Sequence, residues 1–129
     1  MASWKYPGVN DERRGLIPMG TKAADYTVLK GDNGTTFVTT AATNYTLPAV
    51  ANVENGWHAR FFNAADANMT ITAPSGKLIV FNNVAATSIA FSTASEKAGA
   101  AVEIVYSSAA AAYIAFVMLG AETQTPTIA

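Results

Sequence analysis

The chain contains no cysteine and a single histidine among its 129 residues. Without cysteine it can form no disulfide bond and carries no thiolate chemistry, and a zinc site would have to be built from His58 and carboxylates alone. Charged residues are also scarce, at 13% of the chain, where soluble domains typically have about a quarter. The sequence therefore describes neither a disulfide-rich scaffold nor a disordered charged tail.

The charges that are present nearly cancel, leaving a net charge of −1. So small a charge creates no field that attracts phosphate backbones or anionic lipid, so we expect no nucleic-acid and no membrane partner. The most apolar segment, 104–119, is shorter than the roughly 20 residues of a membrane-spanning helix. Charged residues at 11–14 interrupt the apolar run that a signal peptide needs. A protein made in the cytoplasm is the expectation.

A chain of this length fits one domain with one hydrophobic core, but its charges are unevenly placed. Seven of the 17 charged residues lie in the first 25 positions, together with several prolines and glycines. We therefore predict an extended N-terminal arm at 1–24, a compact domain at 25–120 and a flexible C-terminal tail at 121–129. The arm has large side chains suited to docking on its own domain or on a partner subunit: Trp4, Tyr6, Arg13, Arg14, Leu16 and Ile17.

Short apolar segments separated by turn residues follow the arm. Residues 68–72 alternate polar and apolar side chains, as a half-buried strand does. The glycine-rich turn at 31–34 predicts a hairpin joining 26–29 to 35–40. Such segments recur about every ten residues, a spacing typical of an antiparallel β-sandwich or jelly roll. An alanine-rich stretch leaves a helical turn at 95–99 as an open alternative.

The last long strand, 113–119, is apolar on both of its faces. A strand of this kind is central or covered, here by the arm, by the other sheet or by a second copy of the protein. The last alternative favours a homo-oligomer. Its candidate interface residues are Tyr113, Phe116 and Met118.

No group of residues points to catalysis. A general base needs a partner and a substrate proton within hydrogen-bond reach, and no sequence feature supplies either to His58. Glu103 is expected to face solvent or to pair with Arg60 or a lysine. The oxygen-rich turns at Asp32 and Asp66 lack the spacing of a calcium loop. We therefore predict a protein that is not an enzyme, with no catalytic, cofactor-binding or metal site.

The domain at 25–120 resembles small β-rich modules of tailed-bacteriophage virions, which occur in capsid decoration (cement) proteins and in tail- or head-fibre proteins. The resemblance is carried by hydrophobic and turn positions in six segments: 25–28, 34–37, 46–48, 57–63, 68–73 and 76–79. It is greatest to decoration proteins, because fibres usually place such a module at the end of a much longer chain.

The resemblance implies a structural virion protein without enzymatic activity. It would be a homotrimer on the outer capsid surface, with the major capsid protein as its partner, and would stabilise the shell. The arm residues would then be the capsid anchors, because aromatic and arginine side chains dominate interface energetics. The alternative is a fibre module that reads a receptor or glycan with the loops around Asp32, Asp66 and Asn82.

Overall fold

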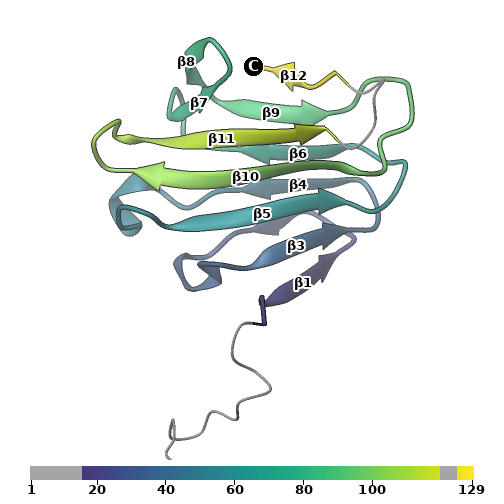
Figure 1. Ribbon diagram of the computed structural model, residues 1–129, viewed down its shortest axis with the longest axis horizontal. Coiled ribbons are helices and arrows are strands. Elements are labelled where there is room, and N and C mark those ends of the chain that lie inside the picture. The colour runs from purple at the N-terminus through teal and green to yellow at the C-terminus, as the bar shows by residue number, and fades with distance from the viewer. Residues whose placement is uncertain (1–15, 120–124) are drawn as a thin grey trace, which may run out of the picture.

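The computed structural model of the protein describes residues 16–119 and 125–129. Two β-sheets pack face to face, with β5, β10 and β11 of the larger sheet in front of β4, β6 and β9 of the smaller one (Figure 1). Two 3-10 turns, Lys30–Asp32 and Val50–Asn52, are the helical segments among these residues. The predicted all-β sandwich is confirmed.

The larger sheet has seven strands in the order β1-β3-β5-β10-β11-β7-β8. Their bounds are β1 (Met19–Lys22), β3 (Thr36–Thr39), β5 (His58–Asn63), β7 (Leu78–Val80), β8 (Asn83–Ala86), β10 (Ala100–Ser107) and β11 (Ala112–Leu119). The smaller sheet has the order β12-β9-β6-β4-β2. Its strands are β2 (Tyr26–Thr27), β4 (Thr43–Thr46), β6 (Met69–Thr72), β9 (Ser88–Phe91) and β12 (Thr127–Ile128).

The first six strands alternate between the two sheets. β1, β3 and β5 pair in parallel in the larger sheet, while β2, β4 and β6 pair in parallel in the smaller one. Tyr26 aligns with Tyr45, and the ladder continues where the Val28 amide donates to the Thr46 carbonyl at 2.8 Å. This half of the chain thus winds as three two-strand coils, each stacked on the one before.

The predicted hairpin at 26–40 is wrong, because β2 and β3 lie in different sheets. The Asp32 carboxylate accepts hydrogen bonds from the Leu29 amide and the Tyr26 hydroxyl, both at 2.8 Å, and so fixes a turn that crosses between the sheets. Tyr26 and Phe37 consequently meet across the core, with ring centroids 5.5 Å apart. The parallel pairing among the first six strands also differs from the predicted antiparallel jelly roll.

Antiparallel pairing holds in much of the second half of the chain. β10 pairs antiparallel with β5 and β11, β9 with β6, and β7 with β8, whereas β7 and β11 are parallel. The helical turn considered at 95–99 does not form. Instead, the Lys97 amide donates to the Asp66 carboxylate at 3.1 Å, and the Ala98 amide to the Glu96 carboxylate at 3.0 Å.

Two strands lie where the sequence predicted an arm and a tail. β1 falls within 1–24 and pairs with β3, and β12 falls within 121–129 and pairs with β9. Gly20 lets β1 approach closely, because a Cβ there would be 3.3 Å from a ring carbon of Phe37. Ile128 packs against the core. The sandwich therefore begins earlier and ends later than predicted.

Aromatic rings from both sheets meet at the centre of the core. The Phe37 ring stacks on Phe61 at 5.4 Å between centroids, and Tyr45 lies 4.8 Å from Phe61 and 5.5 Å from Phe37. The Tyr45 hydroxyl is 2.6 Å from the Thr39 hydroxyl, so its buried oxygen is hydrogen-bonded. Burial of each such ring contributes about 1.5–3 kcal/mol to stability. Packing within this cluster therefore holds the two sheets together.

Candidate interaction face of the larger sheet

The larger sheet has one side packed on the smaller sheet and one side turned away from it, here called the outer face. Residues such as Phe61, Val102 and Ile104 point inward and are fully buried. Because successive strand residues point to opposite sides, the residues between them form the outer face. Its apolar members are Met19, Val38, Phe62, Ile79, Ala101, Val105, Ile114, Phe116 and Met118.

Strand register arranges these side chains in rows across the sheet. One row runs Val38, Phe62, Ala101, Met118 over β3, β5, β10 and β11. Another runs His58, Val105, Ile114, Ile79. Phe62, Phe116 and Met118 are 41%, 53% and 47% exposed. Burying the exposed halves of these three side chains would contribute about 1 kcal/mol each.

A third row carries the charges of the face. It runs Thr36, Arg60, Glu103, Phe116, and Arg60 lies directly opposite Glu103 in the register. Arg60 Nε is 3.2 Å from Glu103 Oε2, so of the alternatives left open for Glu103 the structure has the pair with Arg60. Among the described strand residues of this face, these two are the charged ones. Since the pair is partly exposed, it adds little to stability.

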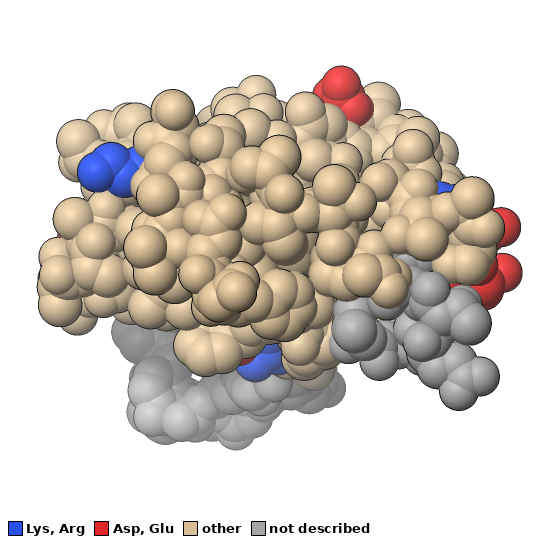
Figure 2. All heavy atoms as spheres, turned by 90° about the horizontal axis from the view of Figure 1, so that it is seen from above, with Lys and Arg blue, Asp and Glu red and all other residues tan. Residues whose placement is uncertain are grey.

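The scarcity of charge extends beyond this face. Figure 2 views the molecule from the side of β8 and β12, and few charged side chains appear on that surface. Val84 on β8 is 72% exposed there.

The structure separates the three predicted interface residues. Phe116 and Met118 lie on the outer face. Tyr113 is fully buried, its hydroxyl donates to the Pro48 carbonyl at 2.7 Å, and its ring meets Trp57 edge-on. Burial raises the pKa of Tyr113 above its usual value. The prediction that Tyr113 lies at an interface was therefore wrong, because its side chain is on the side of β11 that faces the core.

Of the predicted capsid-binding arm, the structure describes Leu16 and Ile17. They are 68% and 50% exposed and lie just before β1, an edge strand of the larger sheet. Trp4, Tyr6, Arg13 and Arg14 lie outside the described residues. Met19, which follows them on β1, is 63% exposed and aligns with Thr36 of the outer face, so exposed apolar side chains continue from that face toward the arm.

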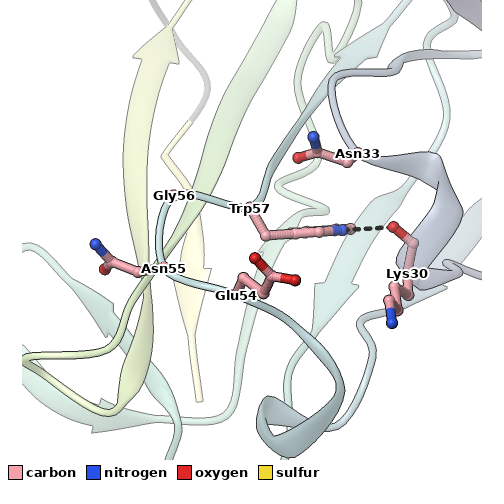
Figure 3. Close-up of a pocket in the computed structure, with 6 residues that line it drawn as sticks. All are labelled: Lys30, Asn33, Glu54, Asn55, Gly56 and Trp57. Carbon is pink, nitrogen blue, oxygen red and sulfur yellow. Dashed lines mark hydrogen bonds between the residues drawn. The ribbon is translucent and has the colours of Figure 1, made fainter.

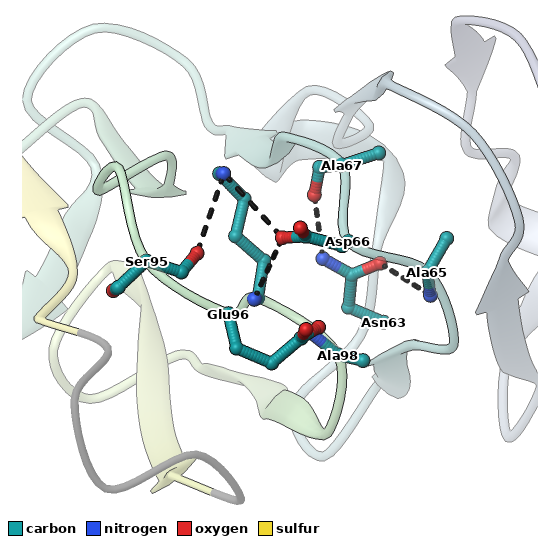
Figure 4. A network of polar contacts seen from close by, with 8 residues as sticks. Asn63, Ala65, Asp66, Ala67, Ser95, Glu96 and Ala98 are labelled. Atoms are coloured by element: carbon teal, nitrogen blue, oxygen red, sulfur yellow. Dashed lines mark hydrogen bonds and ion pairs between the residues drawn. The ribbon is translucent and has the colours of Figure 1, made fainter.

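The loops considered for glycan or receptor binding hold their own structure together. Asp66 accepts the Lys97 amide and lies 3.6 Å from the Lys97 ammonium, so the loop after β5 is tied to the loop before β10 (Figure 4). Buried Asn63 donates to the Ala67 carbonyl at 2.7 Å. Asp32 fixes the turn after β2, as described above. Asn82 lies exposed in the turn between β7 and β8.

A cavity of about 310 Å³ lies at the end of β5, beside Lys30 and Glu54 (Figure 3). Trp57 is buried in its wall, and its indole nitrogen donates to the Lys30 carbonyl at 2.9 Å. The side-chain oxygens of Asn33 and Asn55 accept the amides of His58 and Ser108. These polar groups join loops, and the described residues that line the cavity include no nucleophile paired with a base.

His58 lies at the end of the outer face, with Nδ1 3.1 Å from the Gly56 carbonyl oxygen. Within the described part of the chain, no three histidine or acidic side chains gather closely enough to hold a metal ion. Nor does that part contain a helix of the length and hydrophobicity needed to cross a bilayer.

Sequence reasoning located two residues of the outer face and missed the others. A signal was present in 57–62, where aromatic side chains occupy both strand phases, so that one aromatic must face away from the core. Comparisons of the chain with protein families, curated proteins and solved structures found no match.

Proposed function

We propose that this chain is a structural protein of a tailed-bacteriophage virion, a capsid decoration protein that binds the outer shell as a homotrimer and stabilises it. Its partner is the major capsid protein, and it performs no catalysis. The observation that carries the proposal is the apolar outer face of the larger sheet, with Phe62, Phe116 and Met118 half exposed around one ion pair. A surface of this kind is suited to contact with other protein subunits.

The proposal divides the contacts between two parts of the chain. The outer face joins copies of the protein to one another, and the arm that ends at Leu16 and Ile17 binds the shell. Trp4 and Arg13 supply the types of side chain that anchor interfaces. A protein that binds the assembled shell and not its free subunits stabilises the shell by mass action.

The test is binding of the purified full-length chain to empty shells of its own phage, followed by co-sedimentation and by the melting temperature of the shells. We expect the wild-type chain to co-sediment and to raise the melting temperature. An arm variant, Trp4→Ala with Tyr6→Ala, Leu16→Ser and Ile17→Ser, should remain folded and trimeric but lose shell binding.

The matched control is Phe81→Ala with Val84→Ala, which removes exposed apolar side chains in the turn after β7 and on β8 and should leave binding unchanged. Absence of wild-type binding would overturn the proposal. Decoration by the arm variant would overturn the role of the arm. The fibre-module alternative gains no support from the loops at Asp32 and Asp66, because the Asp32 carboxylate holds its own turn and the Asp66 carboxylate ties its loop to Lys97.

A further inference from the structure

The outer face has two halves that complement each other in charge and in size. The half on the β5 side presents Arg60 and the half on the β10 side presents Glu103, in the same row. In the neighbouring row, large Phe62 on β5 is matched by small Ala101 on β10. Farther out in that row, Val38 on β3 is matched by the longer Met118 on β11. A surface whose two halves fit each other can bind a copy of itself.

Symmetry decides how the copies meet. A rotation axis that runs parallel to the strands, in front of the line between β5 and β10, brings the β5 half of one copy onto the β10 half of the next at the same height. Arg60, which is paired with Glu103 within its own copy, then also lies opposite Glu103 of the next copy, and Phe62 lies opposite its Ala101. An axis across the strands through this row would place Arg60 against Arg60, which is repulsive.

We infer that the occupant of the outer face is another copy of this chain, arranged in a closed ring about an axis parallel to the strands, with the β5 half of each copy packed on the β10 half of its neighbour. This deepens the proposed function and rests on it for the number of copies, three. The face carries one positive and one negative charge, so it selects no charged partner but matches itself.

The experiment measures the mass of the full-length chain in solution by light scattering. The wild-type chain should have three times 13.4 kDa, about 40 kDa. Phe62→Glu places a charge in the β5 half and Met118→Glu places one in the β10 half. Each variant alone should give a monomer of 13.4 kDa, with an unchanged far-ultraviolet circular dichroism spectrum.

Mixing the two variants gives the decisive result. The intact β10 half of the Phe62→Glu chain can bind the intact β5 half of the Met118→Glu chain. The other half of each chain carries the new glutamate and cannot bind. The mixture should therefore form a pair of twice 13.4 kDa, about 27 kDa, and nothing larger. Val84→Glu, on the edge strand β8 and three strands away from β10, should leave the trimer intact. Arg60→Glu and Glu103→Arg should each lower the mass, and together restore it.

A monomeric wild-type chain would overturn the inference, as would variants that stay trimeric or that fail to pair when mixed. Its failure is distinguishable from failure of the proposed function, because shell binding is measured separately. A monomer that decorates shells contradicts the ring alone. A trimer that does not bind shells contradicts the decoration role alone.

Discussion

Backbone strain is concentrated at two residues of the described chain. Phe81 and Ala111 are its non-glycine residues with positive φ, at 53° and 54°. Ala111 lies in the exposed turn between β10 and β11, where a left-handed conformation costs an L-residue about 1–2 kcal/mol. Ala111→Gly removes this cost but makes the unfolded chain more flexible, so we expect the free energy of unfolding to rise by about 1 kcal/mol or less.

The matched control is Ala110→Gly, one residue earlier in the same exposed turn, where φ is not positive. This change adds flexibility without relieving strain and should lower the free energy of unfolding by about 0.5–1 kcal/mol. Urea unfolding measures both. Two changes of the same sign would show that Ala111 is not strained.

Buried tyrosines make the protein sensitive to alkali. Tyr45 and Tyr113 are fully buried, and burial raises the pKa of each, although the hydrogen bond with Thr39 partly opposes the change at Tyr45. Below the ordinary tyrosine pKa of about 10, both are neutral in the folded and unfolded chain. Above it, the unfolded chain loses their protons while the folded chain keeps them, so stability falls as pH rises.

We expect Tyr113 to lower the free energy of unfolding by up to about 1.4 kcal/mol per pH unit above pH 10, and Tyr45 to change it in the same direction. Urea unfolding between pH 9 and 11.5 measures the slope. Tyr113→Phe should lower stability at neutral pH, because the hydrogen bond to the Pro48 carbonyl is lost, but it should make the alkaline slope shallower. An unchanged slope would contradict the prediction.

At the scale of elements, β1 depends on a glycine. Gly20 lies over the ring of Phe37, and a Cβ at this position would be 3.3 and 3.4 Å from two of its ring carbons. A valine here must displace the ring or the strand. We expect Gly20→Val to lower the free energy of unfolding by about 1–3 kcal/mol.

Thr21→Val is the control, because Thr21 is exposed on the same strand and valine favours strands. It should change stability by less than about 0.5 kcal/mol. Urea unfolding compares the two variants. An equal loss for both would show that β1 tolerates no larger side chain anywhere, and that contact with Phe37 is not the cause.

The positions of the strands were easier to predict from sequence than the pairing between them. Alternation at 68–72 marks β6 correctly, because alternation follows from which side of a strand is buried. It does not say which strand lies alongside, so the stacked parallel coils were missed. A signal existed in the similar runs Asp25-Tyr26-Thr27 and Asn44-Tyr45-Thr46, whose tyrosines and threonines pair in register. Repeats this short are visible only once the pairing is known.

The outer face was predictable in part for the same reason. Apolar residues on both phases of 113–119 indicated a second contact surface, and the outward phase contains Phe116 and Met118. Deciding which phase faced inward required the sheet, and Tyr113 was placed on the wrong side. Val105 and Ile114 join the face because β10 and β11 align them, which no single segment reveals.

At the scale of the whole molecule, the two sheets are expected to unfold as one unit. Consecutive strands among the first six lie in different sheets, so each strand pairs with a strand of the next or the previous coil. No coil therefore has a complete core by itself. The Phe37 and Phe61 rings of the larger sheet touch the Tyr45 ring of the smaller one. Loss of either sheet would expose this cluster, so neither should persist alone.

Phe61→Ala tests this coupling. The ring is fully buried between Phe37 and Tyr45, so its loss should lower the free energy of unfolding by about 3–5 kcal/mol. Trp4→Phe leaves Trp57 as the single tryptophan of the chain, so its fluorescence reports on the sandwich. In that background, fluorescence and far-ultraviolet circular dichroism should give one shared urea midpoint, before and after Phe61→Ala.

The matched control is Phe81→Ala, which removes a phenylalanine that is 64% exposed and should change stability by less than about 0.5 kcal/mol. If the two sheets were independent, Phe61→Ala would split the transition, because each sheet would then lose contacts to a different extent. Fluorescence would follow the surroundings of Trp57, while circular dichroism would follow the strands of both sheets. Two separated midpoints would therefore show that the aromatic cluster does not join the sheets into one cooperative unit.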